Sequence, residues 1–245
     1  MSESSTDAVV ETMTNEYTVA NTVYVSEYSA TGVRSGYQTL ELKGITGFGA
    51  VCKRGLDILI ASVAFTLLAP LMAIIAALVK LDSRGPAFYR STRIGKDNQE
   101  FECLKFRSMI VNADDLKEGL RSQNQRQGAT FKIAGDPRIT RFGAFIRRYS
   151  LDELPQIVNV LKGDMSIVGP RPHPVDDVAR YESSDLERHR VKPGITGLWQ
   201  VEARRDPSFR RNMELDLEYI RNWSLMLDLR IICKTFAAVI RGEGQ

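Results

Sequence analysis

The longest hydrophobic run of the chain lies in its first third. Ile58–Val79 contains 22 residues without a charge, and charged residues stand close before and after it. A straight helix of this length would measure about 33 Å, which is enough to cross a bilayer core of about 30 Å. The pattern therefore predicts a membrane helix, and a simple crossing is its plainest interpretation.

Two features of the same run favour another topology. Pro70 lies near its middle, where a proline removes a backbone hydrogen bond and kinks or breaks a helix. Basic residues stand at both ends, Lys53 and Arg54 before the run and Lys80 and Arg84 after it. Because positive charge tends to stay in the cytoplasm, both ends are expected on one side. A bent, re-entrant helix satisfies both features, and the residues alone leave the two topologies open.

Shorter patterns fill the rest of the chain. Alternation predicts strands at Ala87–Arg90 and Phe101–Phe106, joined by a polar turn. The charged segment 112–127 is expected to be a surface helix or a mobile segment. Two amphipathic helices are predicted at Ser208–Arg221 and Leu225–Arg241, and the second could pack on the domain or lie in the membrane interface. The expected fold class is α+β, a small and mostly helical domain with short strands.

The predicted organisation has three parts: residues 1–47, 48–84 and 85–245. The first part has no sustained period and lacks a basic segment followed by an apolar run, so it does not resemble a secretory signal. It is interpreted as a mostly disordered cytoplasmic tail with a transient strand near Thr22–Tyr28. The second part is the membrane helix and the third the catalytic domain.

Charge is distributed unevenly along the chain. Residues 1–47 carry two basic and six acidic side chains, whereas the remainder carries 31 basic and 24 acidic ones. A basic body suits an anionic membrane surface or nucleotide substrates. No zinc finger or RNA-recognition signature supports nucleic acid as a partner. The 3 cysteines are widely spaced and form neither a metal pattern nor a disulfide framework, which indicates a reducing compartment.

The segment most suggestive of chemistry is Arg147–Pro172. Asp152 and Glu153 are adjacent and follow Arg147, and a helix is predicted to begin near Ser150–Asp152. At the positive end of a helix, carboxylates and bound phosphates are both favoured. The mixture of charges indicates chemistry on a phosphate, with arginines holding oxygens and a carboxylate attacking phosphorus or binding a metal. Ser150 and Glu153 could equally form a capping box with no catalytic role.

The remainder of this segment favours the chemical interpretation. Lys162–Asp164 is typical of a helix end with a turn, and Met165–Val168 of a short buried strand. Gly169–Pro172 then fixes the backbone and presents Arg171 on a rigid loop. A purely structural segment has little use for that arginine.

Three motifs, SLDELPQ, KGDMSIVGPRP and KPGITGLWQV, resemble the bacterial sugar transferase family of monotopic phosphoglycosyl transferases. The resemblance extends from Lys53 to Arg241. It implies transfer of a sugar 1-phosphate from a UDP-sugar to undecaprenyl phosphate at the cytoplasmic face of the bacterial inner membrane, an initiating step of exopolysaccharide assembly. Members carry a re-entrant helix broken at Ser-Pro, whereas this chain has Ala69-Pro70, so the break must depend on Pro70 and packing.

The resemblance also implies roles for individual residues. Asp152 would attack the sugar-bonded phosphorus and release UMP, and Glu153 would bind Mg²⁺ or manage protons. The substrate-binding residues would be Lys105, Arg147, Arg171, Arg204 and Asp228, with Asp216 and Tyr219 nearby. Partners implied are a UDP-hexose, undecaprenyl phosphate, membrane phospholipids and other glycan-assembly enzymes.

The sugar itself is indicated only weakly. The LWQ form of the third motif resembles glucose- and galactose-type members. Family members usually show Gly-Arg-Asn where this chain has Ala203-Arg204-Arg205, a departure that bears on sugar specificity.

Two other functions compete with this interpretation. A non-catalytic module could bind anionic lipid through its basic body and membrane helix, and Asp152 and Glu153 would then be dispensable. A direct glycosyltransferase would release UDP rather than UMP. No Gly-rich nucleotide fingerprint favours either.

Overall fold

The structure is a computed structural model that describes residues 13–19, 22–29, 32–39, 44–125, 133, 135–204 and 206–241. The chain forms two compact units, residues 1–42 and 43–245. Residues 1–12 and several other residues of the expected tail lie outside the described residues, as does Arg205, which follows the third motif.

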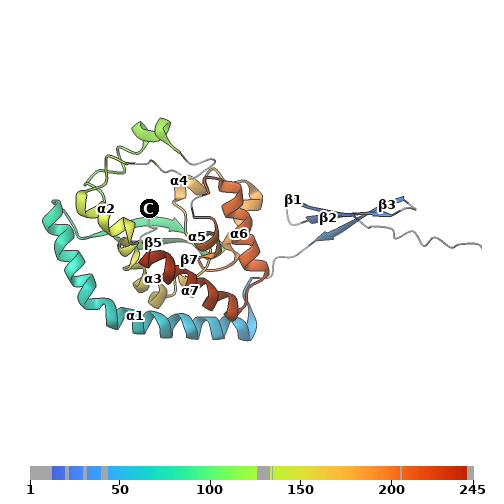
Figure 1. The fold of residues 1–245 in the computed structure, drawn as a ribbon, viewed down its shortest axis with the longest axis horizontal. Coiled ribbons are helices and arrows are strands. Elements are labelled where there is room, and N and C mark those ends of the chain that lie inside the picture. Colours follow the sequence, from blue (N-terminus) through green and yellow to red (C-terminus); the bar gives the residue numbers. More distant parts are fainter. Residues whose placement is uncertain are drawn as a thin grey trace, which may run out of the picture. The chain divides into compact units, whose positions relative to one another are not determined.

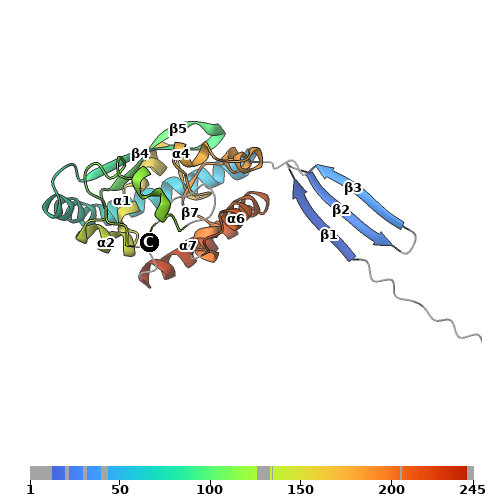
Figure 2. The same cartoon turned by 90° about the horizontal axis from the view of Figure 1, so that it is seen from above.

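The first unit is a three-stranded antiparallel meander. Strands β1 (Met13–Val19), β2 (Thr22–Ser29) and β3 (Gly32–Thr39) lie side by side in chain order (Figure 2). The sequence predicted one transient strand here, near β2. The register places Tyr17 opposite Tyr24 and Tyr24 opposite Tyr37.

The second unit begins with the 36-residue helix α1 (Gly47–Asp82), the one described helix that is long and apolar enough to cross a membrane. It contains Pro70 and is bent but unbroken (Figure 1). The proline cannot donate to the carbonyl of Thr66, four residues earlier. The Thr66 hydroxyl also donates to the carbonyl of Ser62, at 2.9 Å, a bond that bends helices. The helix thus remains continuous through Pro70 rather than broken, and its re-entrant course in a membrane stays a prediction.

The first turns of α1 are fastened to the domain by buried polar contacts. Lys53 forms an ion pair with Asp228, with 2.7 Å between Nζ and Oδ2. Arg54 donates to the carbonyls of Val160 and Leu161, which satisfies the end of another helix. The carboxylate of Asp57 accepts hydrogen bonds from the hydroxyl of Ser166 and from the backbone N–H of Ile167. Asp57 and Ser166 are both buried. Farther along, α1 contributes only apolar side chains to the core.

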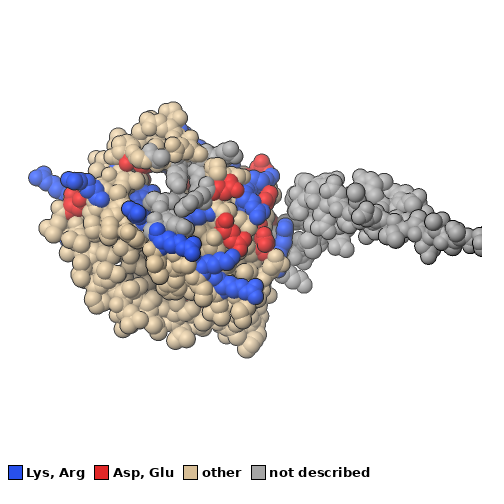
Figure 3. Space-filling view, in the orientation of Figure 1, with Lys and Arg blue, Asp and Glu red and all other residues tan. Residues whose placement is uncertain are grey.

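The outward side of α1 is apolar and exposed. It presents Leu59, Val63, Phe65, Leu67, Leu71, Ile74 and Leu78. In Figure 3 the lower edge of the molecule, along which the middle of α1 runs in Figure 1, shows no charged side chain, whereas charged side chains appear at the left, near the end of the helix. The helix α7 (Leu225–Ile240) adds exposed Met226, Leu229, Phe236 and Ile240. Exposed apolar patches of this kind mark contact with a membrane or a partner.

Strands β4 (Phe88–Ile94) and β5 (Glu100–Phe106) form an antiparallel hairpin. A short 3₁₀ turn, Lys96–Asn98, joins them. The first strand is longer than predicted and includes part of the expected turn. The side chain of Asn159 pairs with the edge of β5, accepting from the N–H of Leu104 at 3.0 Å and donating to the carbonyl of Glu102 at 2.7 Å. This contact fixes the helix that carries Asn159 against the hairpin.

The remaining elements confirm the expected mixture of helices and short strands. Helices α2 (Arg141–Arg148) and α3 (Gln156–Lys162) precede strand β6 (Ser166–Val168), which pairs in parallel with β7 (Gly194–Thr196). Between these strands lie α4 (Val175–Val178) and a 3₁₀ segment, Ser183–Arg190. Helices α5 (Leu198–Glu202) and α6 (Phe209–Arg221) follow. The two predicted C-terminal helices correspond to α6 and α7, each capped by a serine side chain.

Two apolar clusters form the core between α1 and the domain. The first joins Ala61 of α1 to Cys103, Ile157, Val160 and Met165. The second joins Met72, Ile75 and Val79 of α1 to Phe106 and Ile146. Because α1 contributes to both clusters, the apolar helix is part of the domain core on one side and exposed on the other.

Candidate active site

A cavity of about 930 Å³ lies between the β4–β5 hairpin, the α2–α3 connection and α4–α6. Six of the seven predicted catalytic and substrate-binding residues line it: Lys105, Arg147, Asp152, Glu153, Arg171 and Arg204. They come from five separate parts of the chain. Asp228 is not among the lining residues.

The backbone before Asp152 is set by local features. Thr140 caps α2 by accepting from the N–H of Gly143. A side chain at Gly143 would clash with the carbonyl of Ser108, only 2.0 Å from the position of a Cβ, so this contact requires glycine. After α2 the chain reverses at Ser150, which adopts the left-handed conformation with φ 55°. Helical backbone then continues from Leu151 through Lys162, first as a 3₁₀ turn and then as α3.

The capping-box alternative is wrong. Ser150 makes no side-chain cap, and its hydroxyl accepts a hydrogen bond from Arg204 at 3.0 Å. Glu153 turns into the cavity rather than back to the backbone. A left-handed residue cannot present its side chain to the first helical turn as an extended N-cap does. Both members of the motif are thus directed to the cavity.

Glu153 is held between two cations. Its Oε1 accepts from Lys105 at 2.8 Å, and Arg171 contacts both carboxylate oxygens, with 3.1 Å from NH1 to Oε2. Burial alone would raise the pKa of Glu153, but Arg171 and Lys105 together hold this pKa well below its ordinary value. Glu153 is therefore ionised at neutral pH and fixes the positions of both basic side chains.

Asp152 differs from its neighbour. It is 8% exposed, and no hydrogen bond is recorded for its carboxylate among the described residues. Burial raises the pKa of Asp152 in opposition to Lys105, and Glu153 adds to the rise. A weakly solvated carboxylate with no fixed donor is more nucleophilic than one already satisfied by hydrogen bonds. The two adjacent carboxylates thus have different properties because their surroundings differ.

Arg171 lies on a loop that is rigid for identifiable reasons. The N–H of Gly169 donates to Thr196, and the N–H of Gly194 donates to the carbonyl of Pro170. These two glycines approach so closely that a Cβ on Gly194 would lie 2.1 Å from the nitrogen of Gly169. The carbonyl of Arg171 accepts from Arg188 at 2.6 Å. The expectation of an arginine on a fixed loop is confirmed in structure.

Arg188 belongs to a buried polar network behind that loop. It forms an ion pair with Asp216, both side chains being about 1% exposed, and donates to the hydroxyl of Tyr181 at 2.9 Å. Burial raises the pKa of Asp216 to about 6, in opposition to Arg188. Tyr181 also contacts His173, which lines the cavity. The resemblance implied that Asp216 lies near the site. In the structure Asp216 contacts Arg188, which in turn donates to the carbonyl of Arg171.

Asp228 lies in a separate buried cluster. Besides Lys53, it accepts from the hydroxyl of Tyr219 at 2.8 Å and from the indole of Trp223 at 3.2 Å. The same hydroxyl lies 3.1 Å from the carbonyl oxygen of Val168, at the end of β6. In this arrangement Asp228 and Tyr219 join α1, β6, α6 and α7 and do not reach the cavity.

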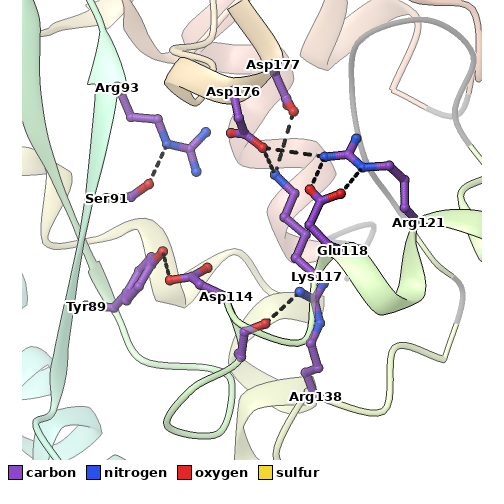
Figure 4. Close-up of polar contacts among 11 residues, drawn as sticks. Tyr89, Ser91, Arg93, Asp114, Lys117, Glu118, Arg121, Arg138, Asp176 and Asp177 are labelled. Atoms are coloured by element: carbon purple, nitrogen blue, oxygen red, sulfur yellow. Dashed lines mark hydrogen bonds and ion pairs between the residues drawn. The ribbon is translucent and has the colours of Figure 1, made fainter.

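The far end of the cavity is bridged by ion pairs (Figure 4). Lys117 contacts Asp176 and, at 3.7 Å, Asp177, whereas Arg121 lies 3.9 Å from Asp176. The hydroxyl of Tyr89 donates to Asp114 at 2.9 Å. These contacts connect the charged segment after β5 to α4 and β4. No chemistry was predicted for that segment, and its observed role is to border the cavity.

One cavity residue was missed from the sequence. Arg93 was assigned to the turn after β4, but the strand continues to Ile94 and the register pairs Arg93 with Phe101. It therefore shares the sheet face of Tyr89 and Lys105. Extending the two-residue alternation past Arg90 would have placed it there.

The expected Mg²⁺ ligand, Glu153, is already occupied by two cations. No group of three or more His, Cys, Asp or Glu side chains gathers within the described residues. Adding a metal between Glu153, Lys105 and Arg171 would place positive charges together. The residues present fit Glu153 as an anchor for basic side chains better than as a metal ligand.

Comparison with known proteins shows the family to which the sequence is similar. The family model for bacterial sugar transferases matches residues 48–242. The exopolysaccharide production protein ExoY of Rhizobium meliloti is 43% identical over 209 residues, which cover 84% of this chain and 92% of that protein. The undecaprenyl-phosphate galactose phosphotransferase of Salmonella typhimurium is 42% identical over 197 residues, 78% of this chain and 41% of that protein. The UDP-glucose:undecaprenyl-phosphate glucose-1-phosphate transferase of Escherichia coli is 41% identical over 206 residues, 81% and 41% respectively.

Proposed function

The chain belongs to the bacterial sugar transferase family, and from this premise we propose that it moves a hexose 1-phosphate from a UDP-hexose to undecaprenyl phosphate. The names of its relatives support this donor and acceptor. The name of ExoY supports a role in exopolysaccharide production.

The observation that carries the proposal is the charge lining the catalytic part of the cavity. Eight Lys and Arg side chains line the whole cavity against six Asp and Glu, and Arg93, Lys105, Arg147, Arg171 and Arg204 line it together with Asp152 and Glu153. The surplus of positive charge suits a diphosphate donor and a lipid phosphate. It does not suit a neutral substrate, and an exposed lipid-binding patch would not require a cavity.

We propose that Asp152 is the nucleophile. A carboxylate oxygen of Asp152 bonds to the sugar-bonded phosphorus, and the bond from that phosphorus to the bridging oxygen breaks. UMP leaves with the electron pair, and the hexose phosphate remains on the carboxylate as an acyl phosphate. An oxygen of undecaprenyl phosphate then attacks the same phosphorus and restores Asp152. One site can thereby serve a soluble donor and a lipid acceptor in turn.

In this scheme Glu153 is a positioning residue. By fixing Lys105 and Arg171 it orients their donors toward the phosphates and keeps them charged. Mg²⁺ is proposed to be held chiefly by the phosphate oxygens of the donor, because Mg²⁺ commonly takes only one or two protein carboxylates. When bound it would neutralise part of the diphosphate charge.

The membrane arrangement is also a proposal. The exposed apolar face of α1 and that of α7 are suited to one leaflet of the cytoplasmic membrane, with the domain on the cytoplasmic side. Because Pro70 bends α1, both ends of the helix can stay on that side. The lipid phosphate would then reach the cavity from the membrane surface.

The decisive experiment measures which nucleotide membranes holding the protein release from UDP-glucose and from UDP-galactose, with Mg²⁺ and undecaprenyl phosphate present. We expect UMP from one of the two donors and none from Asp152→Asn. Release of UDP would indicate a direct glycosyltransferase. Full turnover by Asp152→Asn would exclude the covalent intermediate, and lipid binding without any turnover would favour the non-catalytic alternative.

A further inference from the structure

Arg93 is a partly buried arginine that lines the cavity and forms no ion pair with any described residue. Its Nε donates to the hydroxyl of Ser91 and its NH1 to the carbonyl of Pro172, each at 3.1 Å, and both acceptors are uncharged. Figure 4 shows the guanidinium pointing from β4 into the space beside Asp176 and Asp177. Its second terminal nitrogen, NH2, has no partner among the residues that the structure describes. Burial lowers the pKa of Arg93 and the carboxylate of Asp177 acts to raise it, but this carboxylate lies 3.7 Å from Lys117 and forms no ion pair with Arg93. The unpaired donor of Arg93 is therefore available to an anion in the cavity.

The position of Arg93 relative to Asp152 follows from the contacts around each. Arg93 donates to the carbonyl of Pro172, the residue after Arg171. Arg171 contacts Glu153, the neighbour of Asp152, and Arg93, Arg171 and Asp152 all line the cavity. An extended diphosphate with its sugar-bonded phosphorus at Asp152 would place its other phosphate near Arg93.

We propose that Arg93 binds the donor phosphate that leaves with the nucleoside, and so forms a nucleoside monophosphate subsite beside the nucleophile. This inference rests on the proposed function and assigns one residue of the cavity to the leaving group. The ligand class is a nucleoside monophosphate or the corresponding half of a diphosphate donor.

The subsite has a chemical purpose in the first half of the reaction. When the bond to the bridging oxygen breaks, its electron pair passes to that oxygen, which becomes a terminal oxygen of UMP. The leaving phosphate thereby changes from one negative charge to two, and no proton is needed. A guanidinium already in place stabilises this developing charge more than the charge of the bound donor. Arg93 should therefore act on kcat as well as on nucleotide binding.

The experiment compares binding of UMP and of uridine to the full-length protein in lipid nanodiscs. We expect Arg93→Gln to weaken UMP binding by about 10- to 150-fold, the range for a charged hydrogen bond, and to leave uridine binding unchanged. Arg93→Lys keeps the charge and should retain more UMP affinity than Arg93→Gln. The matched control is Arg90→Gln on the same strand, because Arg90 is 68% exposed and pairs with Glu102.

Each remaining outcome has a definite meaning. Unchanged UMP affinity in Arg93→Gln, with wild-type protein that binds UMP, would overturn the subsite and leave the proposed function standing. If both Arg93 variants lost equal affinity for UMP and for uridine, Arg93 would only stabilise the loop that carries Pro172. A wild-type chain that binds no UMP, but releases UDP from a donor, would overturn the proposed function itself.

Discussion

Lys53 and Asp228 form a buried ion pair across 175 positions of the chain, with 2.7 Å between Nζ and Oδ2. The pair joins the start of the apolar helix α1 to the C-terminal helix α7. Tyr219 and Trp223 satisfy the same carboxylate. The contact therefore holds the membrane helix to the catalytic domain, a role that the family resemblance alone did not indicate.

Replacing Asp228 by Asn should lower stability more than substrate binding. Lys53 would be left buried without its counter-charge, at a loss of about 3 kcal/mol in the free energy of unfolding. We expect a lower Tm and an unchanged KM for the donor. Glu202→Gln is the control, because its contact with Lys234 on α7 is exposed and worth less than about 1 kcal/mol. A raised KM at unchanged Tm would return Asp228 to the substrate site.

Replacing Asp152 by Asn should remove activity without loss of stability. Because burial raises its pKa in the folded state, the ionised carboxylate opposes folding once the pH exceeds the unfolded pKa. The contribution of Asp152 to stability therefore falls as the pH rises from its unfolded pKa to its raised folded pKa. Replacement by Asn removes this loss of stability. We expect kcat to fall at least about a thousandfold while Tm at pH 7 stays equal or rises. A strongly lowered Tm would indicate that Asp152 has a structural partner.

Replacing Glu153 by Gln should have the opposite effect on stability. Its pKa is lowered in the folded state, so its contribution is present above the unfolded pKa and is lost as pH falls through the folded value. We expect a loss of about 2–3 kcal/mol at pH 7, since Lys105 and Arg171 lose their shared partner. The difference in Tm between wild type and Glu153→Gln should shrink as acid is added. A constant difference from neutral to strongly acidic pH would contradict this account.

His189 should make the fold sensitive to mild acid. His189 is 6% exposed, with Nδ1 2.7 Å from Oδ1 of Asn98 and no partner for Nε2 among the described residues. Burial and Arg188 lower the pKa of His189 to about 4. The unfolded chain therefore binds the proton first, and stability falls from about pH 6.5 toward pH 4, by up to about 3 kcal/mol. Urea titrations of His189→Gln should show less of this decline.

Replacing Pro70 by Ala should restore a backbone hydrogen bond and straighten α1. The proposed placement of both helix ends on the cytoplasmic side would then be weakened. Single cysteines at Phe48 and Leu81, in a chain lacking its own cysteines, report which side each end occupies. We expect an impermeant thiol reagent added to inside-out vesicles to label both sites in the parent chain. Labelling of only one site in that chain would show a simple crossing.

Local sequence was enough to predict much of the fold. The helices α6 and α7 and the turn at Gly163 are specified by residues within a few positions of one another. The capping box failed because Arg204, 54 positions away, takes the hydroxyl of Ser150. The contact of the Asn159 side chain with the edge of β5 could not be predicted either, because its partners, Leu104 and Glu102, are distant in sequence.

The site was predicted in part for a similar reason. The motif around Asp152 and Arg171 is compact, and its members do line one cavity. Arg93 was missed because the end of a strand is the least certain feature of a periodic pattern. The resemblance placed Asp228 near the substrate. Its actual surroundings include Lys53 of α1, and no short sequence motif predicts how α1 packs on the domain.

The polar anchors of α1 impose an order on biosynthesis. Lys53, Arg54 and Asp57 all find their partners between Val160 and Asp228, which the ribosome reaches long after α1 has emerged. At about 5–20 residues per second, the 175 positions separating Lys53 from Asp228 take roughly 9 to 35 seconds. In the proposed membrane arrangement, these charged side chains would stay hydrated at the lipid headgroups throughout that interval. The nascent helix would then not enter the bilayer past Asp57 until its own domain has folded onto it.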